Sequence, residues 1–210
     1  VVTAMFEKIM GTCPYKSPTD MGVNMAGNCI IDDEAVREAS CQEILRRYYT
    51  ALCGQRQGVV SEDVIYKLEL LMKKAEVTVH DRVVIAPALQ KAALTGAPAA
   101  AMELPDGTIV TGKTSDLLGA SAALLLNALK ILGGISDDIH LISPVIIEPI
   151  QHLKVSHLGN RNPRLHTDEV LIALSISAAT NPTAELAMEQ LARLRGCEAH
   201  SSVILSAVDE

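Results

Sequence analysis

The residues with the most recognisable chemistry lie between Gly107 and Thr114, where GTIVTGKT fits the phosphate-binding pattern G-x-x-x-x-G-K-[ST]. In such a loop, glycine-rich backbone points several N–H groups at phosphate oxygens, and the following helix contributes its positive N-terminal end. Lys113 would then reach a phosphate, and Thr114 would reach a magnesium ion. A working loop of this kind would make the chain a nucleotide-binding protein.

The residues between the two glycines favour a different structure. Thr108 to Thr111 are all β-branched, and they follow the turn signal 105–107 (Pro-Asp-Gly) and an apolar run that ends at Leu104. We therefore predict a β-hairpin, in which alternate N–H groups point to opposite strand edges and cannot converge on one phosphate. A third alternative is an anion site formed by Lys113, Thr114 and Ser115 at the start of the next helix, which we expect near Ser115.

Two polar loops are further candidates for a binding site. Residues 12–29 are rich in proline, glycine and small polar residues, and residues 159–169 carry arginine and histidine. Long loops often carry function, although such side chains also cap helices and satisfy their own backbone. We expect both loops to form one pocket near Ser115. The candidate ligand-binding residues are Lys16, Ser17, Thr19, Asp20 and Asn24 in the first loop, and Arg161, Arg164, His166 and Asp168 in the second.

The metal-binding residue types are spaced unfavourably for a zinc enzyme. The chain has no H-E-x-x-H motif. Cys197 and His200 fall on an expected strand, where residues three apart point to opposite faces. His152 and His157 fall on an expected helix, where residues five apart do not share a face well. We therefore predict no metal site, expect no zinc, and assign no catalytic residue.

The composition narrows the class of partner and the compartment. Of the 210 residues, 49% are hydrophobic and only 2% are aromatic, and the formal net charge is −7. Few aromatic rings and a negative charge disfavour nucleic acid and anionic membranes as partners. The five cysteines are an odd number without close pairs, which fits a reducing compartment. We predict a cytoplasmic protein that binds neither nucleic acid nor membrane.

The elements that must position these residues indicate an α+β fold that is mainly helical. A hairpin near residues 100–112 and a strand near 198–205 would form a small antiparallel sheet, packed by long apolar helices. We expect residues 1–210 to form one compact C-terminal region of a larger protein, with a possible helical subdomain at 30–96. Helices are expected at residues 1–10, 33–52, 62–74, 82–94, 115–132, 144–158, 168–179 and 182–194.

Four stretches of the sequence resemble one bacterial family of unknown function, whose members carry labels such as putative ATP-dependent peptidase or zinc protease. The resemblance covers nearly the whole chain. Members of that family are longer, and this chain resembles their C-terminal part, so the resemblance implies an upstream half with a glycine-rich segment like a nucleotide loop. The four stretches are YKSPTDMGVNMAG at 15–27, ELPDGTIVTGKTSDLLGASAALLLNALK at 103–130, LHTDEVLIALSISAATNP at 165–182, and GCEAHSSVILS at 196–206.

Two functional hypotheses follow from the motifs and the resemblance. In the first, this chain is part of an enzyme that, with its N-terminal half, binds ATP and magnesium and acts on a small or peptide substrate. In the second, it is a non-catalytic domain for assembly or substrate binding that accompanies a nucleotide-binding domain. The motifs do not support peptidase activity. The expected partners are the N-terminal half of the same protein and a second copy of the chain.

Overall fold

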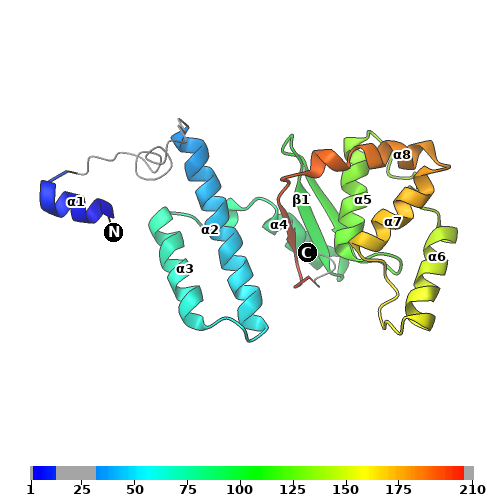
Figure 1. The fold of residues 1–210 in the computed structure, drawn as a ribbon, viewed down its shortest axis with the longest axis horizontal. Coiled ribbons are helices and arrows are strands. Elements are labelled where there is room, and N and C mark those ends of the chain that lie inside the picture. The colour runs from blue at the N-terminus through cyan, green and yellow to red at the C-terminus, as the bar shows by residue number, and fades with distance from the viewer. Residues whose placement is uncertain (1, 13–31, 206–210) are drawn as a thin grey trace. The chain divides into compact units, whose positions relative to one another are not determined.

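The computed structural model describes residues 2–12 and 32–205, and the chain divides into two compact units, Val1–Arg82 and Val83–Glu210 (Figure 1). Among the helices of the described residues, none combines the length and the apolar character that a bilayer crossing requires. Each unit is described separately below.

The first unit is helical. It contains α1 (Val2–Met10), α2 (Asp33–Arg56), α3 (Glu62–Ala75) and the short 3-10 turn η2 (Val79–Asp81). The Asp32 carboxylate caps α2 by accepting a hydrogen bond of 2.9 Å from the backbone N–H of Ala35. The packing of α2 against α3 is centred on a small buried cluster of Leu45, Met72 and Val77. A core of this size leaves much of both helices exposed.

The second unit is built around a three-stranded antiparallel sheet in the order β2-β1-β3. Its strands are β1 (Ala99–Glu103), β2 (Ile109–Lys113) and β3 (Ala199–Ser201). Residues of opposite parity face opposite sides. Ala101 packs with α4 (Ile85–Thr95), whereas Ala100 and Val110 pack with α5 (Ala120–Leu132), so the two helices cover opposite faces. The mainly helical α+β class with a small antiparallel sheet is confirmed.

The hairpin at the centre of the sequence is confirmed, and its turn has the expected chemistry. Gly107 adopts a φ of +81°, and its N–H donates to the Leu104 carbonyl at 2.9 Å. The Asp106 carboxylate accepts a hydrogen bond of 3.0 Å from the Thr108 N–H, which holds the pKa of Asp106 below its usual range. The backbone is then extended and paired from Ile109 to Lys113, so these residues do not form a phosphate cradle.

The second glycine of the phosphate-loop pattern has a packing role. A Cβ atom on Gly112 would lie 2.2 Å from the backbone nitrogen of Leu124, which no real structure tolerates. Glycine at this position lets β2 approach the backbone of α5 directly. The GKT sequence therefore reflects contact between a strand and a helix.

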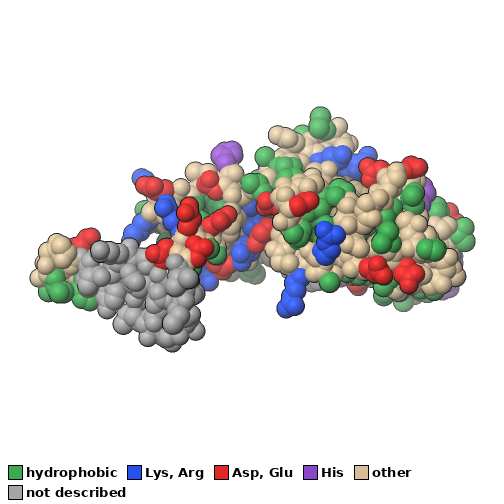
Figure 2. Space-filling view, turned by 90° about the horizontal axis from the view of Figure 1, so that it is seen from above, with side chains coloured by type: hydrophobic (Ala, Val, Ile, Leu, Met, Phe, Trp, Pro, Cys, Tyr) green, Lys and Arg blue, Asp and Glu red, His purple; other side chains and the backbone are tan. Residues whose placement is uncertain are grey.

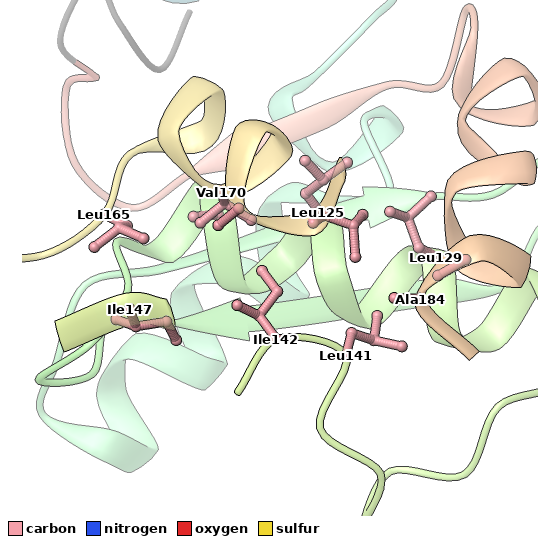
Figure 3. Packing of buried hydrophobic residues seen from close by; sticks show 12 residues of the cluster. Leu125, Leu129, Leu141, Ile142, Ile147, Leu165, Val170 and Ala184 are labelled. Carbon is pink, nitrogen blue, oxygen red and sulfur yellow. The ribbon is translucent and has the colours of Figure 1, made fainter. Parts of the chain in front are cut away.

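An outer layer of helices covers the side of α5 that faces away from the sheet. It consists of α6 (Pro144–His152), the π-helical turn η3 (Leu153–His157), α7 (Thr167–Ala178), α8 (Pro182–Glu189) and the 3-10 turn η4 (Leu191–Leu194). Leu125 and Leu129 of α5 meet Leu165 and Val170 in the largest buried cluster (Figure 3). Helix α5 is thus enclosed between the sheet and this layer.

Several predicted boundaries are wrong by a few residues. The central helix begins at Ala120 and not near Ser115, because the Ser115 hydroxyl accepts hydrogen bonds from the N–H groups of Leu117 and Leu118, at 3.3 and 3.1 Å, in a separate turn. The predicted helix 144–158 is α-helical only to His152 and continues as a π-helical turn. The strand expected at 198–205 is limited to 199–201.

We expect Gly112→Ala to destabilise the protein by about 1–3 kcal/mol, because the added methyl group overlaps helix backbone that cannot rotate away. Urea unfolding of the variant measures this loss. Gly119→Ala is the control, since its Cβ would lie 3.6 Å from the nearest atom and should cost about 1 kcal/mol at most. A Gly112→Ala protein as stable as the parent would contradict the close approach of β2 to α5.

Candidate functional site

The second polar loop lies against the segment that precedes α5. Arg164 donates from Nε to the Ser115 carbonyl at 2.6 Å. The Leu165 N–H donates to the Leu117 carbonyl at 2.9 Å, and the Gly119 N–H donates to the Leu165 carbonyl at 3.0 Å. Loop 159–169 was expected near Ser115, and these bonds confirm that expectation. The segments 115–119 and 164–166 are held together as a short parallel bridge.

A buried lysine holds this loop in place by hydrogen bonds and an ion pair. Lys154, in η3, is only 3% exposed, and its ammonium group donates to the Arg164 carbonyl at 2.7 Å and to the Glu169 carboxylate at 2.6 Å. The same carboxylate oxygen accepts a hydrogen bond of 2.8 Å from the His166 N–H, which closes a capping box at the start of α7. One ion pair therefore joins η3, the loop and α7.

The polar groups of this cluster are occupied by structural hydrogen bonds. A buried ammonium ion is costly unless it is paired, and Lys154 has two strong acceptors. Asp168 accepts from the Glu169 N–H at 2.8 Å, so its carboxylate also serves the first turn of α7. This arrangement supports the alternative in which the polar residues of loop 159–169 cap a helix and satisfy backbone groups.

Sequence reasoning missed the ion pair between Lys154 and Glu169. Lys154 stands between Leu153 and Val155, which is only a weak sign of a buried charge. Glu169 stands three residues after His166, at the spacing of a capping box. Neither signal specifies the other partner, because the contact depends on how η3 turns.

The remaining predicted site residues are only partly brought together. Lys113 is an exposed residue at the end of β2, and the Thr114 N–H donates to the Pro98 carbonyl at 2.8 Å. Because α5 begins at Ala120, the predicted anion site of residues 113–115 does not lie at a helix N-terminus. Arg161 is exposed in the loop. Lys16, Ser17, Thr19, Asp20 and Asn24 lie outside the described residues, so the pocket joining both loops stays a prediction.

An apolar pocket of about 190 Å³ lies beside the 115–119 segment. The two buried or half-buried polar donors in its wall are already paired. Asn127 donates to the Thr111 carbonyl at 2.9 Å, and Lys130 donates to the Asp137 carbonyl at 2.8 Å. The wall is therefore mainly hydrocarbon. It is formed by Leu117, Leu118, Ala123, Leu126, Asn127, Lys130, His140, Leu141, Ile142, Pro144 and Ile147.

The histidines and cysteines do not gather into a larger centre. Within residues 2–12 and 32–205, no three His, Cys, Asp or Glu side chains are grouped to hold a metal ion. Burial raises the pKa of the Cys197 thiol. The prediction that His152 and His157 do not share a face is wrong, because their rings meet with centroids 5.5 Å apart. That prediction assumed α-helical spacing, whereas η3 is a π-helical turn.

We expect Lys154→Met to lower the free energy of unfolding by about 2–3 kcal/mol, because it leaves the Glu169 carboxylate and the Arg164 carbonyl without their buried donor. Thermal or urea unfolding measures the change. Lys154→Met combined with Glu169→Gln should recover part of the loss, since the neutral amide still caps α7 without an unpaired charge. A single variant with parental stability would show that the ion pair does not hold the loop.

Comparison with known proteins places these features in a family. Residues 80–210 match the domain of unknown function DUF1846, C-terminal, and residues 1–76 match its N-terminal counterpart, so the chain matches both parts and not the C-terminal part alone. UPF0371 proteins of Corynebacterium urealyticum, Corynebacterium efficiens and Streptococcus pneumoniae are 56%, 57% and 53% identical over all 210 residues. The chain spans 42% of the length of these relatives. On both grounds, the chain belongs to the DUF1846 (UPF0371) family of proteins of unknown function.

Proposed function

We propose that this chain is a binding or assembly part of a longer protein and does not itself carry out a chemical step. The observation that supports this proposal is that the polar side chains near Ser115 already form hydrogen bonds and an ion pair within the protein. Lys154, Arg164 and Glu169 bond to backbone or to one another, and the adjoining pocket presents mainly hydrocarbon. Such a surface binds by burying apolar groups, and its two buried or half-buried polar side chains, Asn127 and Lys130, already donate to backbone carbonyls.

The pocket fits one aliphatic group. Typical ligand pockets have volumes of about 300–1,000 Å³, and this one has about 190 Å³. The side chains of Asn127 and Lys130 already donate to backbone carbonyls, so a bound group would gain few hydrogen bonds from them. We infer that the pocket takes a single leucine-like side chain from a peptide segment, either of a substrate or of another part of the longer protein.

The division of the chain supports a helical part distinct from the sheet-containing part. The two family matches meet between residues 76 and 80, close to the boundary of the compact units at Arg82 and Val83. Both boundaries fall inside the helical subdomain proposed for residues 30–96. We propose that this subdomain belongs with the N-terminal part of the longer protein and ends before α4.

The first unit also supports the proposal that the rest of the longer protein is a partner. Helix α3 leaves four large apolar side chains exposed beside a core cluster of three buried ones. These four are Val64, Tyr66, Leu70 and Leu71. Apolar exposure on this scale, on a unit with so small a core, indicates a surface for further protein. Acidic side chains gather over the first unit on the face seen in Figure 2, which agrees with a partner other than nucleic acid.

A cytoplasmic location remains part of the proposal. Cys41, Cys53 and Cys197 are free thiols, as a reducing compartment would keep them. A second copy of the chain also remains a proposed partner. Analytical ultracentrifugation would detect such self-association directly.

To test the pocket, N-acetyl-leucinamide is titrated into the protein while the methyl resonances of leucine and isoleucine are followed by NMR. We expect shifts for Leu117, Leu126 and Ile142, with a dissociation constant of about 1 mM or weaker, because burying one leucine side chain contributes only about 2–3 kcal/mol. Ala123→Leu fills the pocket and should abolish these shifts. Ala179→Leu, at an exposed position, is the matched control. Unchanged titration of the Ala123→Leu protein would refute the pocket as the binding site.

The enzyme hypothesis, with ATP and magnesium bound to this chain through residues 107–114, is tested by calorimetry. We expect no saturable heat from ATP with or without magnesium, because Ile109 and Val110 are extended and paired in the sheet. Lys113→Ala should leave the titration unchanged. Saturable binding that disappears in Lys113→Ala would replace the binding-domain proposal with nucleotide chemistry at this segment.

A further inference from the structure

The π-helical turn η3 brings together two histidines that an α-helix would separate. His152 is the last residue of α6, and His157 is the last residue of η3. The Leu158 N–H donates to the Leu153 carbonyl at 3.1 Å, which is the i to i+5 bond that defines a π-helical turn. The wider turn places residues five apart on one side. The two imidazole rings are 5.5 Å apart between centroids, with an angle of 67° between their planes.

The surrounding contacts keep the pair facing solvent. Lys154 occupies the opposite side of the same turn, where it is buried and held by the Arg164 carbonyl and the Glu169 carboxylate. Both histidines are exposed. A turn fastened in this way presents its two rings without first having to be ordered, and such pre-organisation favours binding. The pair is separate from the apolar pocket, which it does not line.

We propose that His152 and His157 form a two-ligand site for a divalent late transition-metal ion such as Ni²⁺, Cu²⁺ or Zn²⁺. Neutral imidazole is a favoured ligand for these ions. Two nitrogens on one ion lie within about 4 Å of each other, given metal–nitrogen distances of ~2.0–2.1 Å, and centroids 5.5 Å apart put the two exposed rings within reach of a shared ion. No third His, Cys, Asp or Glu of the described residues joins the pair, so water completes the coordination.

The test uses Ni²⁺, whose paramagnetism broadens the NMR signals of nearby protons. Histidine ring resonances of the whole chain are followed while nickel chloride is added. The signals of His152 and His157 should broaden first, at lower metal than those of His80 and His140, which are single exposed histidines. His157→Phe keeps an aromatic ring against His152 but removes a ligand. This variant should weaken the response of His152 about tenfold or more.

Two further results decide the proposal. His80→Gln, a control in the other unit, should leave the response of His152 unchanged, and His152→Phe should weaken that of His157 as much as the reciprocal variant does. Equal broadening of all exposed histidines at the same nickel concentration would overturn the site, since each ring would then bind alone. Full retention of the His152 response in His157→Phe would overturn it as well, because the contact would be aromatic packing only.

Discussion

At Gly112 the second strand lies so close to α5 that no side chain fits between them, and the layers of the second unit depend on this contact. Because β2 touches helix backbone directly, Ala100 and Val110 can pack on Leu124 and Ala128 with small side chains. The opposite side of α5 is then left for Leu125 and Leu129, which form the core with the outer helices. An Ala- and Leu-rich sequence with few aromatic residues suits this spacing, since larger rings would push the layers apart.

The outer layer is fixed by polar contacts as well as by apolar packing. The parallel bridge between Leu118 and Leu165 sets the position of loop 159–169. Lys154 of η3 holds the same loop by donating to the Arg164 carbonyl. These contacts join segments ten or more residues apart, and they add to the local bonds in which the side chains of Asn160 and Asn162 accept from backbone N–H groups two residues on. The apolar pocket lies between α5, the segment before it and residues 140–147.

The sequence predicted the structure correctly where one short stretch of residues determines it. Pro105, Asp106 and Gly107 predict the turn, and the β-branched residues that follow predict the strand, so the hairpin was correctly placed. Prediction failed where distant residues decide. Ser115 has the residue type of a helix cap, yet its hydroxyl serves a separate turn that Leu165 supports from far along the chain. The contact between His152 and His157 follows from a π-helical turn, for which the sequence carries no simple periodic signal.

The order of the strands has a consequence for synthesis of the chain on the ribosome. β1 lies in the middle of the sheet, but its partner β3 follows about a hundred residues later, with Ala100 opposite Ser201. Until residues 199–201 emerge, one edge of β1 displays unpaired backbone groups, and Glu103 at the end of the strand is the one charged residue of β1 that could deter another strand. The nascent chain therefore exposes this strand edge for most of the time that its second unit takes to be made, because β2 occupies the other edge of β1 and α4 lies on a face of the sheet.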